Sequence, residues 1–178
     1  MKRKVEVFEY AREILRAVRI GTLVSTKDND KYNTMTIQYG FLGMEWQKPI
    51  FILFLREHRY TNEILQRTGE FTINVPLGDY DKKIVGYCGT HSGRDVDKFK
   101  EMNLHAVPGE LVEAPAIKEF PLTLECKVIY QQLQDRTQIP QDVLDREYPQ
   151  DVEYCALACK EFHTAYYAEV VNSYILED

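Results

Sequence analysis

Alternating apolar and polar positions along most of the chain predict a protein built mainly from β-strands. In residues 32–40 every second side chain belongs to the same face, which is typical of a half-buried strand. The turn-forming run Asp28-Asn29-Asp30 comes just before it, so this strand is expected to return antiparallel to a strand at residues 22–26. Residues 50–55 are continuously apolar, which indicates a strand buried on both faces. The remaining strands are expected at residues 71–75, 122–130 and 154–176.

A few segments have a helical period instead. Residues 8–18 place apolar side chains on one side and arginines on another, and Gly21 follows as a stop. Shorter helices are expected at residues 61–67, 80–85 and 96–102, with Thr61, Asp79 and Asp95 as their N-caps. Strands in no regular βαβ order, with short helices between them, predict a mainly β fold, an antiparallel barrel or sandwich with peripheral helices.

One segment stands apart from this pattern. Residues 131–153 are polar and acidic, and Pro140 and Pro149 interrupt them. We expect an insertion that leaves the sheet, with a helical turn around residues 143–146. The chain length of 178 residues favours one domain, residues 1–178, that contains this insertion.

Composition and charge narrow the classes of function. A net charge of −6 argues against a nucleic-acid partner, because phosphate binding requires a basic surface. The longest apolar run, residues 49–55, is far shorter than the ~20 residues that a membrane span requires. No apolar segment follows the basic N-terminal residues, so we expect a cytoplasmic protein with no membrane association. The 4 cysteines form no CxxC pair, and reduced thiols are the expected state.

The sequence contains no strong catalytic or metal-binding motif. Nucleotide-binding glycine patterns, a serine nucleophile elbow and HExxH are all absent. Cys155, Cys159 and His163 have the spacing C-x3-C-x3-H, which would suit a metal ion on a helix. Their surroundings favour a strand, where residues four apart lie roughly 13 Å apart. We therefore expect no metal site and name no catalytic residue.

Two short segments are candidates for holding an anion. Residues 56–61 follow a buried strand and open a helix, where free backbone N–H groups, Arg56, Arg59 and the Thr61 hydroxyl would suit a phosphate. The alternative is a capped helix with solvated arginines. Residues 88–95 contain two glycines, two hydroxyl side chains and Arg94, and Lys98 follows one turn later. The alternative there is a plain glycine loop with an aspartate cap.

Several segments together resemble a known family. They are residues 33–40, 46–49, 56–61, 69–76, 88–99 and 163–171, and they occur in the order in which the family has them. The sequence resembles the flavin reductase-like, FMN-binding split-barrel proteins, a group that includes flavoredoxin and archaeal ferric reductase. This resemblance implies a six-stranded antiparallel split barrel, and a homodimer with FMN near the subunit interface.

The resemblance also implies site residues, which fall into groups by the part of FMN they would approach. The strand with Asn33, Thr34, Met35, Thr36 and Gln38 would run along the isoalloxazine ring; Arg56, Arg59, Tyr60 and Thr61 would surround the phosphate; Asn74 would reach the ribityl chain; Ser92, Gly93, Arg94 and Lys98 would close the site; and His163 would lie near the ring. Two features depart from the family pattern. Tyr39 stands where many relatives carry another residue, and the 131–153 insertion is long enough for a lid, a dimer arm or a partner surface.

The function implied is an FMN-dependent oxidoreductase that passes electrons from NADH or NADPH, as a transient donor, to free flavin, ferric iron or a protein acceptor. An FMN-holding electron carrier without nicotinamide-dependent activity is the alternative, because the same motifs would serve both. A barrel that has lost flavin is disfavoured, since both candidate loops keep their arginine and hydroxyl side chains.

Overall fold

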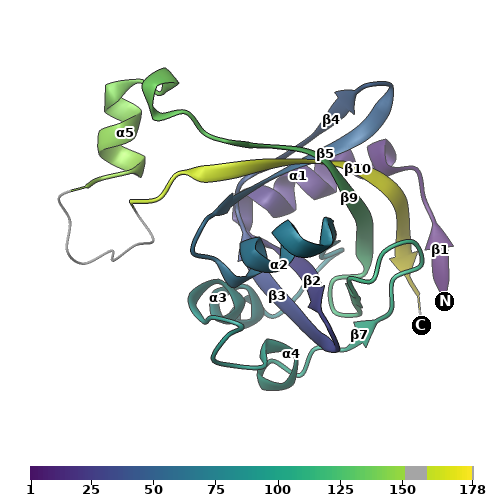
Figure 1. Ribbon diagram of the computed structural model, residues 1–178. Helices are drawn as coiled ribbons and strands as arrows, with labels where there is room; N and C mark the ends of the chain where they lie inside the picture. The colour runs from purple at the N-terminus through teal and green to yellow at the C-terminus, as the bar shows by residue number, and fades with distance from the viewer. Residues whose placement is uncertain (151–159, 178) are drawn as a thin grey trace.

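The computed structural model describes residues 1–150 and 160–177, and its main feature is one antiparallel sheet (Figure 1). The strand order is β3-β2-β6-β9-β10-β5-β4, and β1 pairs with β10. The strands are β1 Lys2–Lys4, β2 Thr22–Asp28, β3 Lys31–Ile37, β4 Gly40–Glu45, β5 Lys48–Arg56, β6 Glu70–Val75, β9 Leu122–Leu133 and β10 His163–Leu176. A separate small sheet pairs β7, Ala106–Val107, with β8, Ala116–Ile117.

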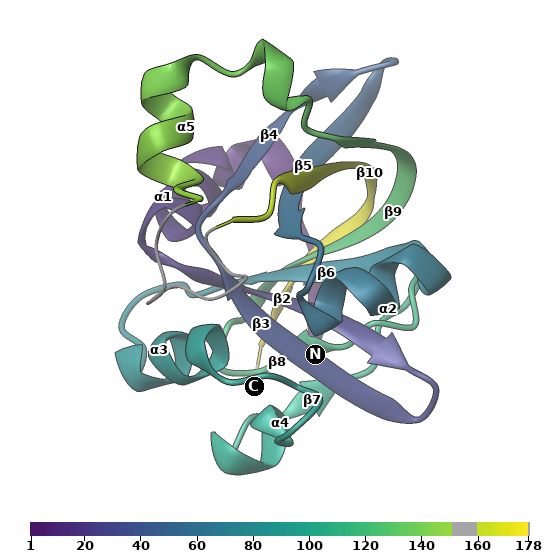
Figure 2. The same ribbon diagram turned by 60° about the vertical axis from the view of Figure 1, so that its left-hand side comes forward.

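Helices surround this sheet, as Figures 1 and 2 show from two sides. They are the 3₁₀ turn Val7–Tyr10, α1 Ala11–Ile20, α2 Tyr60–Thr68, α3 Lys82–Thr90, α4 Lys98–Glu101, the 3₁₀ turn Arg136–Gln138 and α5 Gln141–Glu147. The mainly β class with peripheral helices and antiparallel pairing is therefore confirmed. Within the described residues the main sheet has 8 strands, so the expected strand count of six was wrong.

The core has two parts, one on each side of β2. The larger cluster contains Phe51, Phe71 and Tyr166, and the buried face of α1 packs into it. The smaller cluster joins Leu23 of β2 to Phe120 and the buried side chains of α3. Because α3 is held by this second cluster, the loop that follows it has a defined position against β3.

The strand expected at residues 32–40 divides into two. β3 ends at Ile37 and β4 begins at Gly40, so the chain turns where continuous alternation predicted one strand. β4 then forms a hairpin with β5 through Trp46 and Gln47, which both have positive φ values, 50° and 60°. Such turns usually carry Asn or Gly, so the sequence contains no signal for this hairpin.

The helix starts also differ from the sequence-based expectation. Arg59, not Thr61, is the N-cap position of α2, and the Thr61 hydroxyl accepts a hydrogen bond from Asn33 instead. Asp81 and Asp97 cap α3 and α4, in place of Asp79 and Asp95. In each Asp-x-Asp pair the second carboxylate accepts bonds from the first helical amides.

Residues 131–133 of the predicted insertion continue β9 and pair with β10, and the chain leaves the sheet after Leu133. β9 and β10 extend beyond their neighbours, and α5 lies at the end of this arm (Figure 1). The expected helical turn at 143–146 is part of α5. β10 begins at His163, and residues 160–162 are not strand, whereas residues 154–159 of the expected strand lie outside the described residues.

Two expectations concern membranes and metals. None of the helices that the structure describes is long and apolar enough to span a membrane. Among the described residues, no three His, Cys, Asp or Glu side chains gather as metal ligands. Of the C-x3-C-x3-H series, Cys155 and Cys159 lie outside the described residues.

Gly21 is required where α1 turns into β2. Its φ is +111°, and a Cβ atom placed there would lie 2.6 Å from Cγ1 of Val85 in α3. We expect Gly21→Ala to lower the free energy of unfolding by about 2–4 kcal/mol, through backbone strain and overpacking together. Urea denaturation measures this change. Gly78→Ala is the matched control, since φ is +93° there but no atom lies within 4 Å, and it should cost clearly less.

Candidate functional site

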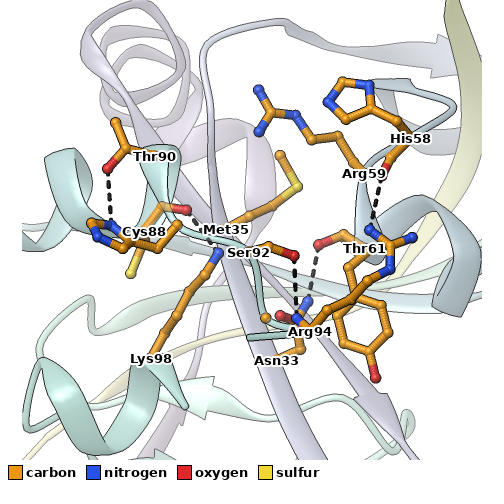
Figure 3. A pocket seen from close by; sticks show the side chains of 13 residues that line it. Asn33, Met35, His58, Arg59, Thr61, Cys88, Thr90, Ser92, Arg94 and Lys98 are labelled. Atoms are coloured by element: carbon orange, nitrogen blue, oxygen red, sulfur yellow. Dashed lines mark hydrogen bonds between the residues drawn. The ribbon is translucent and has the colours of Figure 1, made fainter. Parts of the chain in front are cut away.

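A first cavity, of about 150 Å³, lies where the N-terminus of α2 meets β3 and the loop after α3 (Figure 3). The residues around it come from segments far apart in the sequence, which the sheet brings together. They are Asn33, Met35, His58, Arg59, Tyr60, Thr61, Cys88, Thr90, His91, Ser92, Gly93, Arg94 and Lys98.

Positive charge is concentrated in this cavity. The Arg59 guanidinium has no hydrogen-bond partner among the described residues, and Figure 3 shows it extending without a bonded neighbour. Burial and the charge of Arg56 lower the pKa of Arg59. Lys98 is buried, its Nζ donates to the Cys88 carbonyl at 2.9 Å, and burial together with the charge of Arg59 lowers its pKa to about 8. Cations that depress one another's pKa values favour a bound anion.

One acid acts on this group but does not neutralise it. Glu161 raises the pKa of Arg59 electrostatically. Its carboxylate, however, accepts hydrogen bonds from the backbone amide and the imidazole of His58. The guanidinium donors of Arg59 therefore remain available to a ligand.

A close backbone approach holds the loop after α3 against β3. A Cβ atom at Gly93 would lie 2.0 Å from Oδ1 of Asn33, so only glycine fits at this position. The Gly93 carbonyl accepts a bond from Nζ of Lys31 at 2.8 Å, and Nδ2 of Asn33 donates to Thr61 Oγ1 at 2.9 Å. Because Oγ1 of Thr61 accepts this bond, its hydroxyl hydrogen is free to point at a ligand.

Arg94 has a structural role at the rim. Its guanidinium donates to the His58 carbonyl at 3.0 Å and to Glu63 at 2.7 Å, and it lies over the ring of Tyr60. The hydroxyl of Tyr60 in turn donates to Asp28 at 2.6 Å. The ion pair with Glu63 neutralises the charge of Arg94. Arg94 therefore closes the rim of the cavity by joining the loop after α3 to α2.

A second cavity of about 340 Å³ continues from the first, with which it shares Met35 and Arg59. The chain from Met35 to Tyr39 forms one side, and Phe54, Arg56 and His163 form the other. Thr36 donates through Oγ1 to the carbonyl of Val85 at 2.6 Å, which holds α3 against this strand. The result is a slot between strand backbone and side chains, open to the cationic cavity at one end.

A third cavity of about 470 Å³ adjoins the second and shares Gln38, Tyr39, Phe54 and His163 with it. The insertion supplies its outer wall through α5 and the residue that follows it. Those wall residues are Val143, Glu147 and Tyr148. The insertion is thus part of the site region and not a remote appendage.

His163 stands at the junction of the second and third cavities, in a directed hydrogen-bond chain. Arg56 Nε can only donate, so Nε2 of His163 accepts at 3.3 Å and the ring proton lies on Nδ1. Nδ1 faces the Tyr148 hydroxyl at 2.8 Å, and that hydroxyl donates to Oε1 of Gln134 at 2.7 Å. Burial and the charges of Arg56 and Arg59 lower the pKa of His163 to about 4, so it is neutral near pH 7.

Arg56 keeps an unused donor in this region. Its Nη2 donates to the Glu147 carbonyl at 3.3 Å, whereas its Nη1 is buried and lacks a hydrogen-bond partner among the described atoms. A buried unpaired donor is costly unless a ligand satisfies it. This atom is therefore a further donor that a polar ligand could use.

The structure brings most of the predicted site residues to the first two cavities. They are Asn33, Met35, Thr36, Gln38, Arg56, Arg59, Tyr60, Thr61, Ser92, Gly93, Arg94, Lys98 and His163. It does not bring Thr34 or Asn74 to any of the three cavities.

Thr34 and Asn74 do not line a cavity because they belong to a buried polar network inside the sheet. Thr34 Oγ1 donates to the Val24 carbonyl at 3.0 Å. Asn74 donates to Ser25 and Thr72, and its Oδ1 accepts from the Ile117 amide at 3.0 Å. With its amide group fully used in this way, Asn74 has no donor left for a ligand.

Other lining residues were not expected from the sequence. Tyr148, Gln134 and Glu147 belong to the insertion, and Phe54 was assigned only to the core. The sequence carries no signal for them, because their proximity depends on long-range contacts of the insertion with Arg56 and His163. His58 and His91 lie in the two segments predicted to bind an anion, although neither histidine was predicted as a site residue. The structure places both at the first cavity.

Comparison with known proteins gives a consistent result. Residues 17–178 match the family model described as "Flavin reductase like domain". An uncharacterized protein of Archaeoglobus fulgidus is 30% identical over 100 residues, which cover 56% of this chain and 55% of that protein. The alignment thus spans about half the length of this relative.

Two solved structures are similar across most of the chain. Flavoredoxin of Desulfovibrio vulgaris has a TM-score of 0.65 at 28% identity and covers 88% of this chain and 69% of its own. The NADH:FAD oxidoreductase SgcE6 of Streptomyces globisporus has a TM-score of 0.60 at 18% identity, with coverages of 88% and 75%. This second likeness concerns the fold alone.

The low pKa of His163 makes stability depend on pH. An unfolded histidine titrates near ~6.5. As the pH falls from about 6.5 to 4, the unfolded state binds a proton that the folded state does not, so the free energy of unfolding should fall by up to about 3 kcal/mol.

We expect His163→Gln to remove this loss, as measured by urea denaturation at about pH 7 and about pH 4.5. His91→Gln, at an exposed histidine, is the control and should retain it. An equal pH dependence in wild type and His163→Gln would contradict the assignment.

Proposed function

Because the chain belongs to the flavin reductase-like family, we propose that it binds FMN and passes electrons from NADH or NADPH to an acceptor. Membership supports a flavin cofactor. The choice of FMN, of the nicotinamide donor and of the acceptor is our proposal. Free flavin, ferric iron and a protein remain the acceptor classes that the sequence suggests.

The observation that carries this proposal is the unpaired Arg59 guanidinium beside Lys98 and the free hydroxyl hydrogen of Thr61. These groups suit a phosphate monoester, since charge-assisted donors prefer phosphate oxygens and α2 directs its N-terminus to the same cavity. The volume of about 150 Å³, and the Arg94–Glu63 bridge at the rim, suit one terminal phosphate better than an adenylate. This is why we propose FMN rather than FAD.

The second cavity would then receive the ring. It extends from the phosphate end along Met35 to Tyr39, and Arg56 offers its unpaired Nη1 there. When bound, the flavin supplies the redox chemistry, accepting a hydride from reduced nicotinamide and passing electrons onward. The chain's own residues bind, orient and shield the ring, and neutral His163 keeps Arg56 aimed into the cavity.

We also propose a homodimer. One face of the sheet carries an apolar row across four strands, made of Phe41, Ile52, Tyr167 and Tyr130 in direct register. Phe41 is 60% exposed and Tyr130 is 44% exposed. Exposed aromatic rows of this kind are typical of protein interfaces. The dimer and the cytoplasmic location remain predictions, the latter supported by the buried free thiols of Cys88 and Cys126.

Removal of the phosphate donors tests the placement of FMN. The double variant Arg59→Ala, Thr61→Ala should weaken FMN binding at least about tenfold, because charge-assisted contacts contribute ~1.5–3 kcal/mol each. Flavin fluorescence titration measures the affinity. Arg67→Ala is the matched control, since this arginine is also on α2 but pairs with Asp28 and Glu63. Unchanged affinity in the double variant would place the phosphate elsewhere.

An electron carrier without nicotinamide activity is the second candidate, and the likeness to flavoredoxin favours it. Anaerobic addition of NADH, then NADPH, then dithionite to the FMN-loaded protein separates the two. We expect the flavin absorbance to bleach within seconds of adding one of the nicotinamides. A flavin that stays oxidised until dithionite is added would support the carrier instead.

A further inference from the structure

Arg56 carries a positive charge that no acidic side chain in the described part of the chain neutralises. Its Nε donates to Nε2 of His163 at 3.3 Å, and its Nη2 donates to the carbonyl of Glu147 at 3.3 Å. The guanidinium also lies 5.5 Å from the centre of the Tyr148 ring. The carboxylate of Glu147 pairs with Arg146 at 2.8 Å instead. All the groups that hold Arg56 are therefore uncharged, and its charge remains available to a ligand.

The neutral state of His163 follows from the direction of its hydrogen bonds. Arg56 can only donate, so Nε2 of His163 carries no proton and the ring proton lies on Nδ1. The oxygen of the Tyr148 hydroxyl faces Nδ1 at 2.8 Å, and this hydroxyl donates to Oε1 of Gln134 at 2.7 Å. The donors thus run in one direction from Arg56 to Gln134. The last two members of this chain belong to the 131–153 insertion.

The second cavity, which we propose receives the flavin ring, is the one that Arg56 lines. Its lining contains Arg56 and Arg59 and no aspartate or glutamate among the described residues. Arg56 lines neither the first nor the third cavity, whereas Arg59 also lines the first. A cation without a paired acid therefore lies beside the proposed place of the ring, apart from the proposed phosphate donors.

We propose that Arg56 stabilises the reduced form of the bound flavin, and that the insertion supports this effect by positioning the guanidinium. A hydride brings two electrons and one proton to the ring, so the ring gains one negative charge, and the nicotinamide leaves in its oxidised form. An unpaired cation beside the ring interacts more favourably with this charged form than with the oxidised one. The reduction potential of bound FMN is higher as a result. This inference rests on the proposed function and deepens it.

The reduction potential of the bound flavin tests the role of Arg56. In Arg56→Met at saturating FMN, we expect the affinity for reduced FMN to fall at least about tenfold more than the affinity for oxidised FMN. This change lowers the two-electron midpoint potential by about 30 mV or more. A redox titration against a reference dye measures it. Arg67→Met is the matched control, because it removes an equal charge from α2 at a residue that lines none of the three cavities.

Two further variants separate the charge of Arg56 from its contribution to folding. Arg56→Gln removes the charge but keeps amide donors, so it should lower the potential as Arg56→Met does, and it replaces that variant if Arg56→Met does not fold. Arg56→Lys keeps the charge and should retain most of the wild-type potential. An equal fall in Arg56→Lys and Arg56→Gln would overturn the inference, since the charge would then not be the cause.

The hydroxyl of Tyr148 tests the part played by the insertion. Tyr148→Phe keeps the ring beside Arg56 but removes the acceptor that holds the His163 proton on Nδ1, so the potential should fall by less than in Arg56→Met. In the Arg56→Met background the same change should cause no further fall, because it acts through the guanidinium. Tyr80→Phe is the control, since Tyr80 packs on Phe120 and lines none of the three cavities.

Failure of this inference is distinguishable from failure of the proposed function. If the wild type does not bind FMN, the proposed function fails and the inference fails with it. If FMN binds and Arg56→Met weakens its oxidised and reduced forms equally, the potential is unchanged and only the inference is overturned. That result would indicate that Arg56 holds the phosphate. An equal fall caused by Tyr148→Phe in both backgrounds would overturn the positioning role of the insertion.

Discussion

The pairing of β10 with β5 sets His163 directly opposite Arg56, and the geometry of the site depends on this register. A shift of β10 by one residue would turn His163 to the other face of the sheet and separate it from Arg56. In the observed register the end of β5 leads straight into the N-terminus of α2. The end of one strand therefore positions Arg56 and Arg59, the second cavity and part of the wall of the third together.

The same arrangement places like charges close to one another. Arg56 lowers the pKa values of Arg59 and His163, and Arg59 lowers those of Lys98 and His163. Such a group costs stability in the free protein, and the well-packed clusters on both sides of β2 offset that cost. A bound anion would relieve the repulsion, so we expect ligand binding and folding stability to be linked here.

Basic side chains line the first two cavities, whereas aromatic side chains dominate the third. The strands supply most of the third cavity's lining, and the insertion adds Val143, Glu147 and Tyr148 as its outer wall. The two regions are not independent, because Arg56 lines the second cavity and donates to the Glu147 carbonyl in the wall of the third.

Local patterns were sufficient for the strand-rich class and most element positions, because period and capping chemistry act over a few residues. The two segments predicted to bind an anion, which contain Arg59, Thr61 and Lys98, do meet at one cavity, and their role there stays a prediction. The split between β3 and β4 was not predicted, since Trp46 and Gln47 adopt positive φ without a turn signal. Thr34 and Asn74 were assigned to the ligand, although pairing with neighbouring strands turns them into a buried network.

The contacts that bring the insertion to His163 and Arg56 depend on long-range packing. Tyr148 reaches His163 across 15 positions of sequence, and Glu147 meets Arg56 across 91, so no local pattern records either contact. The sequence predicts Gly93 as part of an anion loop, and the structure adds a packing reason, since a Cβ atom placed there would lie 2.0 Å from Oδ1 of Asn33. Residue types in the sequence indicate which chemistry is available. Only the sheet register and the fold of the arm decide which of those groups face the same space.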